Sequence, residues 1–185
     1  MKADPIENQN RLFAIASGQA GYFTAQQAKS AGYYKRLQHY HRQRGNWLSV
    51  EHGVFRLRNF PENRWEDLVR WSLWSRNQKG DIQATVSHES AASFHELADY
   101  LPMKVHLTVP KSFRKRFMEG CILHRGTIPP EESELHEGFH VTKPLRTLQD
   151  LARAGGERDQ LLQAINQAVQ RGLITRAQQE SLNMH

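Results

Sequence analysis

Glycine residues divide the first third of the chain into short segments. Apolar residues at helical spacing predict a helix over residues 8–17, with Gly18 as its C-terminal stop. Thr24 and Gln27 form a capping-box pattern that begins a second helix of about two turns, and Gly32 ends it. The chain therefore begins with two short helices in close succession.

The next segments predict a third helix and a β-hairpin. The helix is expected over about residues 34–44. Short strands at 47–50 and 54–57 flank a tight turn in which Gly53 supplies a positive φ. Helices followed directly by a hairpin are the layout of a winged helix-turn-helix, although three short helices also suit a plain structural bundle. We expect a winged helix-turn-helix DNA-binding domain over residues 1–60.

Charge is distributed unevenly along the chain, whose formal net charge is +6. Residues 1–60 hold nine Lys and Arg against three acidic residues, whereas residues 61–185 hold sixteen of each sign. No acidic residue lies between Glu7 and Glu51. Because a carboxylate would repel phosphate, this gap suits a surface that approaches a polyanion. A basic segment that only aids solubility is the alternative.

The composition is that of a soluble globular protein, with 38% hydrophobic and 24% charged residues. The polar N-terminus lacks the apolar stretch of a secretory signal, and no segment is apolar enough for a membrane span. We therefore expect a cytoplasmic protein without membrane contact. The single cysteine, Cys121, forms no internal disulfide and builds no zinc site alone. It lies among the apolar residues of a predicted strand, so we expect it in the core.

The remainder of the chain alternates between helical and strand patterns, so the predicted fold class is α+β. Residues 61–80 are expected to form a linker and an amphipathic helix that braces the two halves of the chain. Residues 81–185 are expected to form a mixed α/β C-terminal domain with an effector role. In that domain, strands are predicted at 103–109, 120–124 and 139–141, and helices at 87–100, 144–151, 159–171 and 175–182.

The third helix carries the sharpest candidate site. Leu37 and Tyr40 lie three residues apart and are expected to face the core. Another face is polar and basic, and a helix of about 16 Å fits a major groove, where Lys and Arg reach guanine and Gln reaches adenine. Contacts with phosphate alone would give affinity without sequence choice. We expect base contacts from Tyr34, Lys35, Gln38 and His39, and phosphate contacts from Arg36, Arg42 and Arg44.

The hairpin offers a second predicted contact with DNA. Arg56 and Arg58 are two residues apart and are expected to share one face of the strand, and His52 lies at the turn. Such a wing presses against phosphates or enters the adjacent minor groove. The alternative is a small hairpin with incidental charge.

Catalytic patterns are weak by comparison. Two His-Glu pairs, at His88 and His95, resemble fragments of a zinc-protease motif, but neither has a second histidine four residues later. The acidic residues and histidines of 131–140 suit a solvated loop better than a metal site. No P-loop, dinucleotide fingerprint or nucleophile elbow is present. We expect no catalytic residues, no metal and no cofactor, and hence no enzyme.

Residues 11–61 resemble the N-terminal domain of AbiEi-family antitoxins from type IV toxin–antitoxin systems. The helix pair around Phe23-Thr24 and the hairpin sequence GNWLSVEHGVFRL carry this resemblance. Two further segments, VSHESAASFHEL (86–97) and VTKPLRTLQDLA (141–152), look like parts of the domain that follows in that family. Tyr34 departs from the family, in which a small hydroxyl residue is frequent at this position.

The resemblance implies an antitoxin that represses its own operon by binding double-stranded DNA at promoter repeats. It also implies a neighbouring gene for a nucleotidyltransferase-like toxin, which such antitoxins oppose without forming a stable complex. The family's DNA-contacting positions correspond here to Lys35, Arg36, His39, Arg42, Arg44, Arg56 and Arg58.

Two other functions remain open at this point. One is a stand-alone winged-helix regulator whose C-terminal domain senses a ligand or mediates dimerisation. The other is an enzyme with a DNA-targeting arm, such as a nuclease that uses the acidic residues of 131–137.

Overall fold

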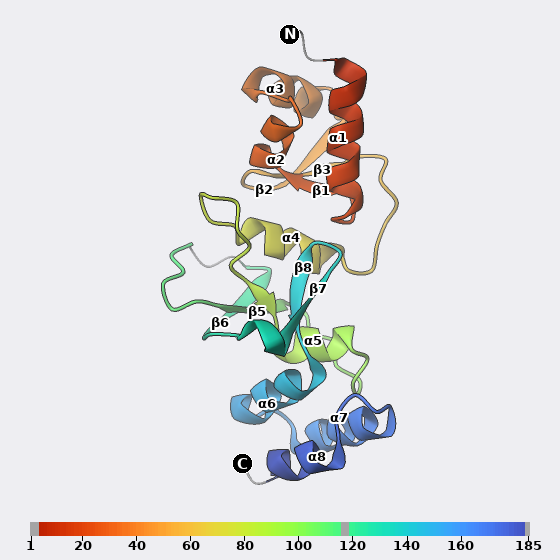
Figure 1. Cartoon of the computed structure of the whole chain (residues 1–185), viewed down its shortest axis with the longest axis vertical. Helices are drawn as coiled ribbons and strands as arrows, with labels where there is room; N and C mark the ends of the chain where they lie inside the picture. The colour runs from red at the N-terminus through yellow and green to blue at the C-terminus, as the bar shows by residue number, and fades with distance from the viewer. Residues whose placement is uncertain (1–3, 116–118, 184–185) are drawn as a thin grey trace. The chain divides into compact units, whose positions relative to one another are not determined.

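The computed structural model describes residues 4–115 and 119–183. This part of the chain is α+β, with eight α-helices and two sheets (Figure 1). It divides into two compact units. The first comprises Met1–Ile82 and Glu137–Phe139, and the second comprises Gln83–His136 and His140–His185.

The first unit contains the three helices and the hairpin expected from the sequence, together with one short strand and one further helix. Its sheet is antiparallel, with the strand order β1-β3-β2. The elements are α1 (Pro5–Ser17), β1 (Tyr22–Thr24), α2 (Ala25–Ser30), α3 (Lys35–Gln43), β2 (Trp47–Glu51), β3 (Val54–Leu57) and α4 (Glu66–Trp74).

Local contacts explain where α1 and α2 begin and end. The Asp4 carboxylate accepts a hydrogen bond from the Ile6 amide at the start of α1. The predicted capping box is confirmed, because Thr24 and Gln27 each accept the other's backbone N–H. Gly32 follows α2 with a φ of +95°, and a Cβ there would clash with a side chain of α1. The two helices therefore meet at a position that requires glycine.

Aromatic side chains fill the core of the first unit. Phe23 is fully buried and contacts the Trp47 ring edge-to-face, with ring centroids 4.9 Å apart. Phe55 from β3 completes this group, 5.8 Å from Phe23. Leu12 and Ala16 of α1 cover it, so the hairpin and α1 share one hydrophobic core.

The helix that was expected to brace the two halves belongs to the first unit. α4 packs against β1, β2 and β3, and the unit continues to Ile82. The first compact unit is therefore longer than the predicted domain of residues 1–60, because the segment from 61 to 80 packs with it.

The second unit is built on a five-stranded mixed sheet with the order β6-β5-β4-β8-β7. β4 pairs antiparallel with β5 and parallel with β8, and β5 pairs parallel with β6. Its elements are β4 (Thr85–Val86), α5 (His88–Phe94), β5 (Val105–Val109), β6 (Cys121–Arg125), a 3₁₀ turn η1 (Pro130–Glu132), β7 (Ser133–His136), β8 (Phe139–Thr142), α6 (Pro144–Ala154), α7 (Arg158–Gln170) and α8 (Arg176–Asn183).

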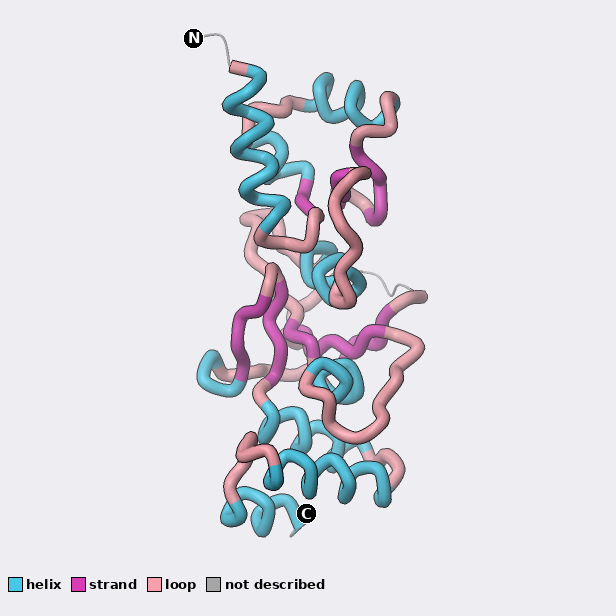
Figure 2. Tube along the Cα trace, turned by 90° about the vertical axis from the view of Figure 1, so that its right-hand side faces the viewer, coloured by secondary structure: helices cyan, strands magenta, loops and turns pink. Residues whose placement is uncertain are grey.

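A helical layer forms the second core. α6, α7 and α8 pack on one another, as the tube in Figure 2 also shows, and α5 packs on α6. Leu148 and Ala164 are fully buried between them. The predicted strands and the last three predicted helices are present as β5, β6, β8 and α6 to α8. The helix expected over 87–100 ends at Phe94, because Glu96 and Ala98 adopt positive φ.

Two smaller expectations also have an outcome. Cys121 is fully buried in β6, as its apolar neighbours predicted. The acidic residues expected in a loop instead form η1 and β7. Over residues 4–115 and 119–183, no helix has the length and apolar character that a bilayer crossing requires.

Candidate nucleic-acid interface

Polar side chains hold α3 in place. The Gln38 amide nitrogen donates to the carbonyl oxygens of Ala25 and Tyr33, at 2.9 and 2.7 Å. The His41 ring stacks on Trp47 with centroids 4.9 Å apart and an interplanar angle of 13°. Burial lowers the pKa of His41, which favours the neutral form of this stacked ring. The helix is therefore fixed through Gln38 and His41 and has no buried residue.

This arrangement corrects two expectations about α3. Leu37 and Tyr40, predicted to face the core, are 42% and 50% exposed. Gln38, predicted to contact a base, uses its two amide N–H donors to bind the fold. An apolar side chain at position 38 would leave the carbonyl oxygens of Ala25 and Tyr33 without this hydrogen-bond donor, and an unpaired buried carbonyl is costly. The Gln38 amide therefore stabilises the unit better than an apolar side chain would.

The basic residues predicted on α3 are all exposed: Lys35, Arg36, His39, Arg42 and Arg44. At about 100° per residue, the side of α3 opposite Gln38 and His41 carries Arg36, His39, Tyr40 and Gln43. Tyr40 and Gln43 were not expected in the candidate site. Tyr40 and Gln43 belong to the candidate site because both are exposed on the outward side of α3. Helical spacing alone did not show which side of this helix faces the core.

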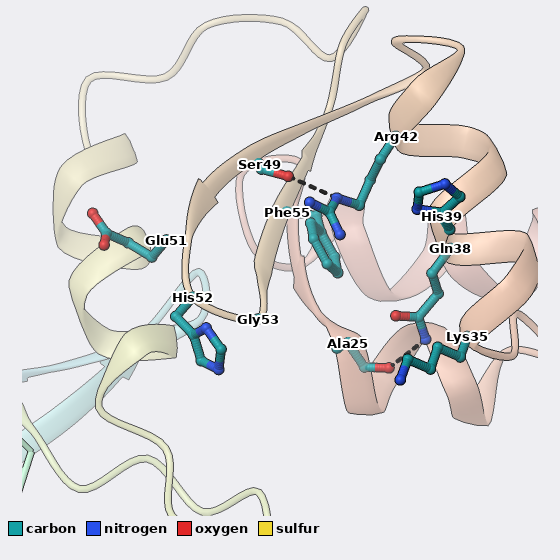
Figure 3. A pocket seen from close by; sticks show the side chains of 10 residues that line it. All are labelled: Ala25, Lys35, Gln38, His39, Arg42, Ser49, Glu51, His52, Gly53 and Phe55. Atoms are coloured by element: carbon teal, nitrogen blue, oxygen red, sulfur yellow. Dashed lines mark hydrogen bonds between the residues drawn. The ribbon is translucent and has the colours of Figure 1, made fainter.

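A pocket of about 460 Å³, here named the α3–hairpin pocket, lies between α3 and the hairpin β2–β3 (Figure 3). Lys35 and His39 come from the helix, His52 comes from the hairpin turn, and the Phe55 ring lies between the two elements. The remaining lining residues are Ala25, Gln38, Arg42, Ser49, Glu51 and Gly53.

Arg42 crosses this pocket from the helix to the hairpin. Its Nε donates to Ser49 Oγ at 2.9 Å, and its guanidinium carbon lies 5.5 Å from the centre of the Phe55 ring (Figure 3). The hydrogen bond uses Nε alone, and the ring face attracts the cation. Arg42 is therefore a cation held in one position at the surface.

The one acidic residue in the described lining of the pocket, Glu51, points away from it. The Glu51 carboxylate is directed toward α4 (Figure 3), where its Oε1 lies 3.6 Å from Arg70 Nε. Arg70 also pairs with Asp67 of the same helix, at 3.3 Å. Glu51 belongs to the hairpin that forms one wall of the pocket, but its carboxylate is turned outward. The side chains that face an approaching ligand are therefore cationic or neutral.

Arg56 does not lie on the surface where it was predicted. It is 8% exposed, and its Nη2 donates to Glu66 Oε1 at 2.6 Å and to the Phe60 and Pro61 carbonyl oxygens at 3.0 and 3.2 Å. Glu66 also accepts a hydrogen bond from the Tyr22 hydroxyl at 3.3 Å. Burial, with the Glu66 carboxylate next, raises the pKa of Tyr22 to about 12. Arg56 therefore serves the fold, since its guanidinium joins β3 to α4.

The other predicted residues of this surface are exposed. Arg58 follows β3 and donates through Nε to the Gly45 carbonyl oxygen, so it does not share a strand face with Arg56. His52 is exposed at the hairpin turn. Tyr34 is the N-cap of α3 without a side-chain hydrogen bond to the helix, and it is 62% exposed.

Three histidines gather in the second unit, at the start of α5 and on β5 and β6. The His88 and His124 rings are stacked with centroids 3.5 Å apart, and His124 Nε2 lies 3.2 Å from His106 Nδ1. Burial, together with the neighbouring histidines, lowers the pKa of His88 to about 3 and lowers that of His124. Within the described ranges, no group of three or more His, Cys, Asp or Glu is placed to hold a metal.

Of the acidic residues considered for a nuclease, Glu132 forms an ion pair within the fold. Glu132 pairs with Arg146, which also donates to Asp150 at 2.8 Å. Glu134 lies in β7 and is exposed.

Comparisons with known proteins show a likeness in fold to a solved structure. No family model matches the chain, and no curated protein matches it. A crystal structure of the RV2827C protein from Mycobacterium tuberculosis is similar, with a TM-score of 0.57 and 14% sequence identity. The match covers 98% of this chain and 72% of that one. At this identity the likeness concerns the fold alone, so the chain shares its overall α+β arrangement with the RV2827C protein.

Proposed function

We propose that this chain is a DNA-binding transcriptional autorepressor whose first unit is a winged helix-turn-helix. In this proposal α2 and α3 form the helix-turn-helix, α3 enters the major groove, and the hairpin β2–β3 is the wing. The observation that carries the proposal is the α3–hairpin pocket, where Lys35 and Arg42 offer cations while Glu51 turns away.

The pocket presents positively charged side chains, which attract the phosphates of a DNA backbone. A duplex that places its major groove on α3 and its minor groove on the hairpin passes one phosphate strand between them. Lys35 and the terminal nitrogens of Arg42 would meet that strand, and each cation that neutralises a phosphate releases a counterion. The absence of acidic residues from 8 to 50 removes repulsion along the same surface.

We further propose that the chain is the antitoxin of a type IV toxin–antitoxin system, acting in the cytoplasm by binding rather than by catalysis. It would repress its own promoter and counter a nucleotidyltransferase-like toxin without forming a stable complex with it. The resemblance of residues 11–61 to the AbiEi family supports this proposal. The two weaker segments of resemblance add support, because they include α5 and α6, which pack against each other.

Fluorescence anisotropy with the full chain tests the DNA-binding function. The two probes are a labelled duplex from the region upstream of the chain's own gene and a random duplex of equal length. We expect the upstream duplex to bind at least about 10³-fold more tightly at physiological salt. Arg11→Ala is the matched control for arginine variants of the pocket and should bind as the unaltered chain does. Arg11 is an exposed arginine of the same unit, and it pairs with Glu7 on α1.

Two results would contradict the proposal. One is the absence of binding to either duplex at low salt, and the other is equal affinity for both. For the antitoxin function, the neighbouring toxin gene that the proposal requires is sought and then expressed with and without the chain. Failure of the chain to restore growth would leave a stand-alone regulator in place of an antitoxin.

A further inference from the structure

Three large apolar or aromatic side chains of α3 and its N-cap are exposed. Leu37 and Tyr40 lie three residues apart and are neighbours on the surface of α3, and Tyr34 precedes them as the exposed N-cap. We name them the apolar stripe of α3. They do not stabilise the core of the first unit, where Gln38 and His41 take the inward positions. The stripe is therefore available for a binding partner.

The charge around the apolar stripe favours nucleic acid over a second copy of the chain. Arg36 is exposed on the same helix, and the Arg44 guanidinium carbon lies 5.6 Å from the centre of the Tyr40 ring. A second copy seated on this stripe would bring like charges together, which disfavours association. A duplex would bring phosphates to the same cations.

We infer that the apolar stripe of α3 contacts thymine methyl groups in the major groove and thereby contributes to operator choice. The inference rests on the proposed DNA-binding function and names the base that this side of the helix recognises. Among base edges in the major groove, the thymine C5-methyl is the apolar group. Leu37 has no hydrogen-bonding group, so a methyl is the feature of a base edge that it can recognise.

Deoxyuridine substitution tests this contact directly. Duplexes that bind the full chain are first selected from a random-sequence pool, and we expect thymine at one or more fixed positions. Each such thymine is then replaced by deoxyuridine, which removes the methyl and keeps the hydrogen-bonding groups. We expect about a fourfold loss of affinity for each contacted methyl.

A variant pair assigns the effect to the apolar stripe. Leu37→Ala is expected to lower affinity for the thymine duplex and to remove the difference between thymine and deoxyuridine. Ile6→Ala is the matched control, because Ile6 is an exposed apolar residue on α1, at 70%, and the thymine preference should persist. Circular dichroism checks that both variants fold. If Leu37→Ala does not fold, the deoxyuridine series with the unaltered chain still overturns the inference when thymine and deoxyuridine duplexes bind equally.

The outcomes separate this inference from the proposed function. Selective binding with a thymine preference that depends on Leu37 supports it. Selective binding with equal affinity for thymine and deoxyuridine overturns the inference and leaves the proposed function standing. Failure to select any duplex overturns both. A change from dimer to monomer in Leu37→Ala, measured by sedimentation, would assign the stripe to a second copy and also overturn the inference.

Discussion

Arg42 and Arg56 belong to the same basic segment, but their surroundings differ. Arg42 is exposed and crosses the α3–hairpin pocket, whereas Arg56 is buried against Glu66 and two carbonyl oxygens. An exposed cation stabilises a fold little, and a buried one whose partner remains is costly to remove. We therefore expect DNA affinity to depend on Arg42 and folding to depend on Arg56.

Arg42→Ala is expected to weaken binding to all duplexes alike, because a phosphate contact carries no base preference. The slope of log affinity against log salt concentration should become shallower by about one unit. Lys35→Ala is the comparison: Lys35 lines the same pocket, so its loss should also weaken binding to all duplexes alike and make the slope shallower by about one unit. Anisotropy at four salt concentrations measures both. An unchanged slope in Arg42→Ala would exclude the phosphate contact.

Arg56→Ala is expected to destabilise the first unit by about 3 kcal/mol, the lower part of the range for breaking a buried pair. The lower part applies because the Glu66 side chain is 26% exposed and remains partly hydrated. Urea denaturation measures the loss. The double variant Arg56→Ala with Glu66→Ala should lose less than the sum of the two single losses, because the carboxylate no longer lacks its partner. Strict additivity would contradict the ion pair.

At the scale of elements, the sequence predicted where α1, α2, α3 and the hairpin lie because their boundaries depend on local residues. The Thr24–Gln27 capping box and the glycines act within a few positions of the chain. The orientation of α3 depends on distant partners, Trp47 and the Ala25 carbonyl, and no local pattern specifies them. The partner of Arg56 lies ten residues away on α4, so the sequence offered no sign that this cation is buried.

The start of α5 meets β5 and β6 at His88, His106 and His124, whose rings fit this contact when they are neutral. His124 and His106 bond only while one ring nitrogen is unprotonated, and the stacked rings of His88 and His124 would repel as cations. Glu89, Arg146 and Asp150 are the charged groups that act on these rings. The contact therefore favours neutral pH.

We expect the free energy of unfolding to fall as pH falls from about 6.5 toward the lowered pKa values, which is about 3 for His88. In that window the unfolded chain binds more protons than the folded chain, so acid favours unfolding, and the full contribution is present above about pH 6.5. Urea denaturation from pH 7.5 to pH 5 measures this slope. His124→Phe should flatten it, because phenylalanine keeps a flat ring and takes no proton.

His140→Asn is the control for that experiment, because His140 lies in β8 outside the three-histidine contact. Its slope should match that of the unaltered chain. Identical slopes for all three proteins would show that other groups cause the loss of stability in acid.

At the scale of the whole molecule, charge and architecture divide the chain in a similar place. The excess of positive charge belongs to residues 1–60, and residues 61–185 sum to zero. The first unit extends to Ile82, and the second has a core of its own in α5 to α8. The proposed repression of the promoter depends on the first unit, so the proposed neutralisation of a toxin can be tested separately.

The double variant Lys35→Ala with Arg42→Ala separates these two activities. Both side chains line the α3–hairpin pocket, so we expect repression of a reporter under the chain's own promoter to be lost. Growth in the presence of the neighbouring toxin should still be restored when the variant is expressed from an unrelated promoter, because the second unit is unaltered. Loss of both activities at equal protein levels would mean that neutralisation depends on DNA binding. Repression by the unaltered chain without any rescue of growth would make the chain a regulator whose second unit serves another partner.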